Sequence, residues 1–203
     1  MTSNLPGQRT GITSTPRNVL LSTKGLIYGR GILDASKAYD GANVGCEDEI
    51  RAGTPLGQIT ATKLWVPCKR TTVTADGGAT SETVPVVDAR AFRVGDTISV
   101  GADTGLTITS IDYSANEITV EESFTFANSE AVVAEDGSQT CRGILNEFVK
   151  LRDEDAVWRN KPFGLLILAG LVDPAMILGD LAAIRGDTNA ELRQILWADR
   201  QGQ

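Results

Sequence analysis

Between residues 70 and 135 the chain repeats one pattern, in which short segments of alternating apolar and polar residues are separated by turns that contain glycine or asparagine. The clearest segments are residues 97–100, 106–112 and 117–121. Alternation with a period of two is typical of strands with one buried face, so five or six closely spaced strands predict a small antiparallel barrel or sandwich. A unit of about 65 residues is large enough to fold alone, and adjacent ends would suit its insertion into a host domain.

The flanking segments, residues 19–69 and 136–203, contain further strand signals and are interpreted together as that host domain. Residues 29–33, with the sequence Gly-Arg-Gly-Ile-Leu, predict a turn followed by the start of a strand. The nine-residue apolar run at 164–172 predicts a fully buried strand, or two strands separated at Gly170.

After residue 172 the sequence predicts two short helices. Asp173 would cap the first helix, Pro174 would occupy its first position, and Gly186 would end it. Asp187 would cap the second helix. The expected inner faces are Ile177, Leu181 and Ile184 in the first helix, and Leu192, Ile195 and Leu196 in the second. The expected fold class is therefore mainly β, with a few short C-terminal helices.

Residues 1–18 contain few large apolar groups and are interpreted as an N-terminal arm. Such an arm is either a simple disordered start or a segment that becomes ordered against a partner. It has no apolar core of the kind that a signal peptide needs, and no apolar run in the chain approaches the roughly 20 residues that span a bilayer. We therefore expect synthesis in the host cytoplasm and no membrane partner.

The chain contains no histidine, which removes the commonest general base and the commonest metal ligand. A Ser-His-Asp triad, a Cys-His dyad and a Cys₂His₂ zinc site are thereby excluded. The formal net charge is −7, and an acidic chain repels phosphate backbones. Direct binding to nucleic acid is therefore not expected.

An acidic stretch made of Asp34, Asp40, Glu47, Asp48 and Glu49 has the ligand chemistry for calcium. It lacks the spacing of a calcium-binding loop, so a solvated loop is the favoured interpretation. The glycines of the chain match no phosphate-binding motif. No metal and no cofactor are expected.

A second acidic group, Glu147, Asp153, Glu154 and Asp155, offers paired carboxylates of the kind that glycoside hydrolysis uses. Aromatic residues make up only 5% of the chain, which leaves little surface on which a sugar could stack. No residue is assigned a catalytic role, and the chain is not expected to be an enzyme.

Three cysteines, Cys46, Cys68 and Cys141, are an odd number and form no C-x-x-C pair. Cys68 and Cys141 flank the inserted stretch and are expected near each other. Two buried thiols are the favoured interpretation, and a disulfide is the alternative in oxidising surroundings.

Two host segments resemble a known protein family. Residues 50–62, with the sequence IRAGTPLGQITAT, look like the "x-G-T-x-L-G-x-I-T" strand of phage head decoration proteins of the lambda D type. Residues 136–145, with the sequence DGSQTCRGIL, are similar to the "D-G-(x)-A-x-G-I-L" strand of that family, with Cys141 and Arg142 in place of small residues. The resemblance covers residues 25–68 and 136–185, and the inserted stretch, the arm and a second C-terminal helix depart from it.

The resemblance implies a cement protein without catalytic function, which binds the outer surface of an expanded phage head as a homotrimer and contacts the major capsid protein. On this interpretation the arm adds as a strand to the capsid protein. The interface candidates are the apolar residues at the start of the chain and an expected half-exposed tryptophan: Leu5, Ile12, Val19, Leu20 and Trp197.

Two alternatives remain open at this point. A tail or fibre structural protein of a phage would have the same β-rich, acidic character. A carboxylate-dependent hydrolase is the enzymatic alternative, and the absence of histidine and of any catalytic motif speaks against it.

Overall fold

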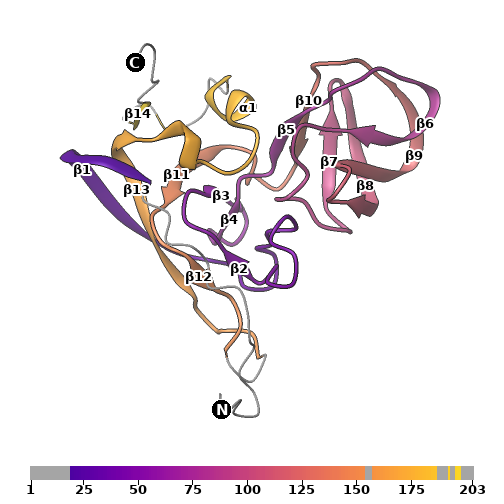
Figure 1. The fold of residues 1–203 in the computed structure, drawn as a ribbon. Coiled ribbons are helices and arrows are strands. Elements are labelled where there is room, and N and C mark those ends of the chain that lie inside the picture. The colour runs from indigo at the N-terminus through magenta and orange to yellow at the C-terminus, as the bar shows by residue number, and fades with distance from the viewer. Residues whose placement is uncertain (1–18, 154–156, 187–191, 193–194, 198–203) are drawn as a thin grey trace, which may run out of the picture.

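The computed structural model describes residues 19–153, 157–186, 192 and 195–197 (Figure 1). Strands make up 51% of the structure and helices 5%, which confirms the mainly β class. The strands form two six-stranded sheets and one two-stranded sheet. One large sheet belongs to the host domain (residues 19–69 and 136–203), and the other belongs to the inserted domain (residues 70–135).

The host sheet has the order β1-β13-β11-β3-β4, with antiparallel pairing throughout, and β14 pairs parallel to β13. Its strands are β1 (Leu20–Ile32), β3 (Pro55–Gln58), β4 (Trp65–Pro67), β11 (Cys141–Leu145), β13 (Phe163–Val172) and β14 (Ile195–Trp197). The apolar run at 164–172 forms β13, as predicted. This strand has β1 along one edge and β11 and β14 along the other. Its residues from Gly164 to Val172 are buried or half-buried on both faces, which accounts for the apolar sequence.

Two clusters of buried side chains pack on the host sheet. One is built around the carboxyl-terminal half of β13 and includes Cys68, Cys141, Ile144 and Ile167. The other lies toward the start of β13 and includes Leu33, Ile50, Leu56, Val66, Leu145, Leu151 and Leu166. The short strands β2 (Glu49–Ile50) and β12 (Val149–Lys150) pair with each other and contribute Ile50 and Val149 to the second cluster.

The second sheet lies entirely within the inserted domain and has the order β5-β10-β7-β8-β9-β6. Its strands are β5 (Arg70–Thr72), β6 (Gly77–Pro85), β7 (Thr97–Val100), β8 (Asp103–Asp112), β9 (Glu117–Phe126) and β10 (Ala131–Ala134). The sheet curls until its outer strands meet, where Val73 and Val86 form a bridge and the Thr74 amide donates to the Pro85 carbonyl at 2.9 Å. It encloses its own core, made of Val73, Val84, Val86, Ala89, Phe92, Ile98, Val100, Leu106, Ile108, Ile118, Val120, Phe126 and Val132. The stretch therefore forms a curled, half-barrel antiparallel sheet; that it is a separate domain that folds alone stays a prediction.

The two connections between the domains lie side by side, as expected for an insertion. Arg70 faces Val133 in the β5–β10 pairing, and the Ala134 amide donates to the Lys69 carbonyl at 3.1 Å. Cys68 and Cys141 share one host core cluster, and all three cysteines are buried free thiols.

Polar side chains join the two domains. Lys69 is 1% exposed, and its ammonium group contacts the Asp96 carboxylate at 2.6 Å. Tyr113 of the inserted domain lies against Tyr39 of the host, with 5.6 Å between ring centroids, and its hydroxyl donates to the Phe92 carbonyl at 2.9 Å. Burial raises the pKa of Tyr113 above its ordinary value, so the phenol stays protonated and remains a donor.

The prediction of two C-terminal helices is wrong in part. Asp173 is an N-cap as expected and accepts from the Ala175 amide, but only a 3₁₀ turn, η1 (Pro174–Met176), follows it. Ile177 is extended and Gly179 has a φ of 95°, so the chain turns before α1 (Leu181–Gly186) begins. The expected second helix is wrong at residues 195–197, which form β14 and occupy the edge of β13 beyond β11, and its expected cap Asp187 lies outside the described residues.

The predicted turn at residues 29–33 is wrong as well, since residues 29–32 belong to β1. Its glycines serve close packing instead of a turn. A Cβ atom on Gly29 would lie 2.7 Å from Leu168 Cδ1, and one on Gly31 would lie 2.8 Å from Trp65 Cδ1.

Candidate docking surface

Strand β1 is an edge strand of the host sheet. It pairs with β13, and no strand among the described residues pairs with its other edge. Four of its large apolar side chains are substantially exposed: Leu21 at 45%, Ile27 at 50%, Tyr28 at 44% and Ile32 at 41%. An edge of this length with apolar exposure is a site at which another chain can add a strand.

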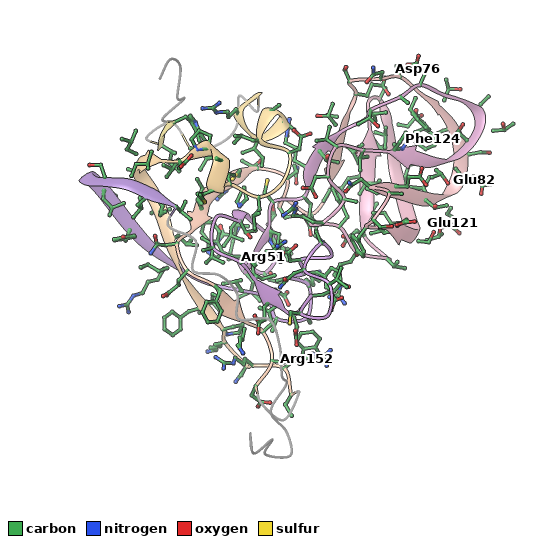
Figure 2. The ribbon with its side chains drawn as sticks, viewed as in Figure 1. Arg51, Asp76, Glu82, Glu121, Phe124 and Arg152 are labelled. Carbon is green, nitrogen blue, oxygen red and sulfur yellow. The ribbon has the colours of Figure 1, made fainter. Side chains whose placement is uncertain are left out.

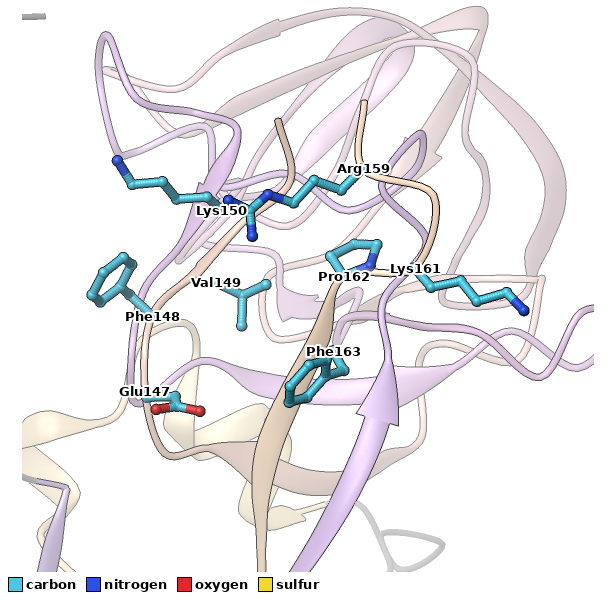
Figure 3. Close-up of a pocket in the computed structure, with 8 residues that line it drawn as sticks. All are labelled: Glu147, Phe148, Val149, Lys150, Arg159, Lys161, Pro162 and Phe163. Carbon is cyan, nitrogen blue, oxygen red and sulfur yellow. The ribbon is translucent and has the colours of Figure 1, made fainter. Parts of the chain in front are cut away.

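A groove of about 460 Å³ lies next to the carboxyl end of β1 (Figure 3). It is lined by Glu147, Phe148, Val149, Lys150, Arg159, Lys161, Pro162 and Phe163. Phe163 faces Ile32 in the β1–β13 pairing, so the groove continues the apolar side of the edge strand. Phe148 is 49% exposed and Phe163 is 61% exposed. Exposed aromatic side chains in a concave site are typical of binding surfaces.

The groove has a positive rim. Lys150 contacts Glu49 at 3.1 Å, whereas Arg159 and Lys161 form no ion pair with any described residue. The backbone amide of Arg159 donates to the Leu151 carbonyl at 2.8 Å, which fixes the segment that carries this guanidinium group. Figure 3 shows the Arg159 side chain pointing across the groove toward Lys150. Such a site can receive a partner that presents apolar and acidic side chains together.

Trp158 and Val157 extend the exposed apolar area beyond the groove. Trp158 is 39% exposed and Val157 is 58% exposed. The Arg152 guanidinium lies 3.9 Å from the centre of the Trp158 ring, which holds the indole in place by a cation–π contact. The indole is thereby preorganised for contact at little entropic cost.

The predicted interface residues lie elsewhere. Leu5 and Ile12 are outside the described residues. Val19 is 1% exposed, and Leu20 and Trp197 are half-buried against the same host core cluster. The Arg185 guanidinium covers the Trp197 ring at 4.7 Å. A role for these residues in an interface stays a prediction.

Sequence reasoning missed the residues that do form the exposed apolar surface. They are Ile27, Tyr28, Ile32, Phe148, Val157, Trp158 and Phe163. The sequence offered one signal, which is a phenylalanine close to basic residues and a proline in the segment Arg-Asn-Lys-Pro-Phe at 159–163. Residues of β1 carried no such signal, because only the pairing order shows that this strand is at an edge.

The acidic stretch at residues 34–49 is structural. Asp40 is 1% exposed and pairs with Arg51 at 2.7 Å, and the Asp34 carboxylate accepts from the Ser36 amide and hydroxyl. The expected solvated loop is therefore wrong for these two carboxylates, which are buried and bonded. Glu47 accepts from the Gly45 amide at 2.8 Å and is part of the same network of turns.

The described residues give no support for paired catalytic carboxylates. Glu147 is the one acidic residue that lines the groove. Asp153 accepts from the Val157 amide at 2.9 Å, while Glu154 and Asp155 are outside the described residues. Within the described part of the chain, no three acidic or cysteine side chains are grouped to hold a metal ion.

Comparison with protein-family models, curated proteins and solved structures finds no match to this chain. None of the helices in the described ranges has the length and apolar character that crossing a membrane requires. The docking surface is therefore interpreted from its own geometry and from the sequence motifs.

Proposed function

We propose that this chain is a capsid decoration protein that binds the outer surface of an expanded phage head, contacts the major capsid protein and acts as a homotrimer. The observation that carries the proposal is the apolar edge of the host sheet that β1 forms. A protein that works by adhesion needs such a surface and needs no reacting group.

The sequence motifs support the same function. The segment that resembles the first family motif contains β3, and the segment that resembles the second contains β11. These strands pair antiparallel, with Leu56 facing Gly143 and Pro55 facing Ile144. Two motifs that are far apart in the sequence thus lie on neighbouring strands of the host sheet, as expected if both belong to one folded unit.

The arm provides the second element of the proposal. Residues 1–18 directly precede Val19 and β1, so a segment that adds to a capsid strand would start beside the exposed edge. Backbone hydrogen bonds along the edge would supply affinity, and the apolar side chains of β1 would supply specificity. The inserted domain would then project from the shell or contact a neighbour.

Cosedimentation with empty expanded heads of the cognate phage tests this function. The variant Ile27→Lys/Ile32→Lys places two charges on the exposed edge and should lower occupancy of the heads at least about tenfold, because charges at the centre of a contact are left desolvated. A control with the same change in charge, Val87→Lys/Val94→Lys, places two lysines on exposed valines of the inserted domain, which are 48% and 63% exposed, and should leave occupancy unchanged.

Deletion of residues 1–18 should also lower occupancy, whereas unchanged occupancy would remove strand addition by the arm. If the edge variant binds like the unmodified protein, the edge is not the docking site. Electron microscopy of virions tests the alternative, because a tail or fibre protein would be found on the tail or the fibres and not on the surface of the head.

A further inference from the structure

Charge is distributed unequally between the two domains. Residues 70–135 contain eleven acidic and three basic side chains, whereas the rest of the chain contains fifteen acidic and sixteen basic ones. The net charge of −7 therefore comes from the inserted domain, and the host domain is close to neutral. The groove, with Arg159 and Lys161, is a positive site on that neutral host.

The inserted domain presents a group of carboxylates where β6 pairs with β9. Glu82 lies at a register shift, between the pairs Ser81–Phe124 and Thr83–Thr119, and Glu121 and Glu122 lie opposite on β9. All three side chains are exposed. None of them forms an ion pair with a described residue, and no metal-binding group of the described chain includes them.

Like charges on facing strands repel one another, so this acidic face (Glu82, Glu121 and Glu122) would gain from a basic partner. Phe124, which is half-buried, packs on the core of the inserted domain and against Phe126, with 5.2 Å between ring centroids, so it lies on the core side of β9. The face therefore presents carboxylates, and the positive rim of the groove is complementary to them in charge.

We propose that the groove of one copy binds the acidic face of the inserted domain of a second copy. Within one copy the two sites do not meet: Glu82 and Glu121 lie on the outer side of the inserted domain, whereas Arg152, which pairs with Trp158 beside the groove, lies in the lower part of the host domain (Figure 2). The contact joins two different surfaces, so it is heterologous and closes into a ring when the rotation between copies allows. It names the surfaces through which copies of the proposed homotrimer would meet, so it rests on that part of the proposed function, although it needs no shell.

Sedimentation of the full chain without heads tests this contact. Arg159→Glu/Lys161→Glu reverses the groove, and Glu82→Lys/Glu121→Lys/Glu122→Lys reverses the face. Each should weaken self-association at least about 100-fold, since close pairs of charges across an interface are strongly coupled. A chain that carries both sets of reversals should associate again. Raising the salt concentration to about 0.5 M should weaken association of the unmodified chain.

The control variant is Lys37→Glu/Lys63→Glu, which changes the net charge by the same amount at two exposed lysines of the host domain outside the groove. It should leave self-association unchanged, which separates the local contact from the effect of total charge. Circular dichroism of every variant checks that the fold is retained.

Four results would overturn the inference: an unmodified chain that stays monomeric, a groove variant that associates normally, a face variant that associates normally, or a combined variant that stays dissociated. Head binding is measured separately, so a monomer that still occupies heads would reject this contact and the homotrimer but keep head decoration.

Discussion

Replacing Asp96 with alanine removes the carboxylate that neutralises a buried ammonium group at the domain junction. Lys69 is 1% exposed, and its contact with Asp96 is 2.6 Å long. At that distance and an effective dielectric constant of about 20, the attraction is about 6 kcal/mol before desolvation is subtracted. Leaving one partner of such a pair buried costs about 3–5 kcal/mol. We expect Asp96→Ala to lower the free energy of unfolding by this amount.

Removing the ammonium group first should abolish most of that loss. Lys69→Met leaves Asp96 18% exposed and bonded to the Arg93 amide at 2.7 Å, so it should cost about 1 kcal/mol or less. In that background Asp96→Ala loses only the bond to the amide, about 1 kcal/mol. The double-mutant cycle should therefore give a coupling of about 2–4 kcal/mol.

Urea unfolding followed by fluorescence and by circular dichroism measures these differences. The three tryptophans, Trp65, Trp158 and Trp197, all lie outside the inserted domain, so fluorescence follows the host domain while circular dichroism follows both. A loss below about 1 kcal/mol for Asp96→Ala, or an equal loss in both backgrounds, would show that the pair does not stabilise the junction as argued.

Three further predictions concern the host sheet, a surface carboxylate and the thiols. Thermal melting should show that Gly53→Ala lowers the free energy of unfolding by more than about 2 kcal/mol, because φ is 87° there and the new Cβ would lie 2.1 Å from the Met176 carbonyl oxygen. The control Gly45→Ala has a similar φ of 80° but open space around the new Cβ, so it should cost only about 1 kcal/mol. Hydrogen bonds from the Ser99 hydroxyl and the Gly105 amide lower the pKa of Glu135, so the stability that its carboxylate contributes is present at neutral pH and is lost as the pH falls through the folded pKa. An NMR titration of the Ser99→Ala variant should show the pKa of Glu135 rising toward 4.5, and an unchanged pKa would contradict the assignment. The three buried thiols should react with a thiol reagent only slowly until urea unfolds the protein, and rapid labelling of the native chain would contradict their burial.

The inserted sheet was predictable because its signal is local. Strands β7 to β10 alternate over all or part of their length, and the turn at Asn116 joins β8 to β9 in the expected hairpin, in which Asp112 faces Glu117. The run that forms β13 was predictable for the same reason, since a continuous apolar segment of that length between breakers has few other places in a β protein.

The elements that were not predictable depend on contacts between distant segments. Gly29 and Gly31 look like turn residues, yet Leu168 and Trp65 take the space that their missing side chains leave. Residues 195–197 were expected in a helix, yet they pair as a parallel strand with residues 170–172 of β13, whose edge beyond β11 is open there. A short apolar segment does not distinguish helix from strand by itself, so the available edge decides.

The same limit applies to the candidate docking surface. Nothing in the sequence of β1 marks Ile27 or Tyr28 as exposed, because their exposure follows from the position of β1 at the end of the pairing order. The acidic face was visible only as scattered carboxylates until the β6–β9 register brought Glu82 beside Glu121 and Glu122.

The hydrogen bond between the Ala134 amide and the Lys69 carbonyl places the two ends of residues 70–135 next to each other, so this stretch could be replaced without moving the host strands. The host sheet closes its own pairing without any strand from this stretch, so a tight hairpin would bridge the same two positions at the expense of the junction contacts. Recombination at these two positions would exchange the inserted domain while the strands of the host sheet keep their pairing. A foreign domain whose termini lie close together could be inserted at the same two positions and would occupy the same place on the host domain.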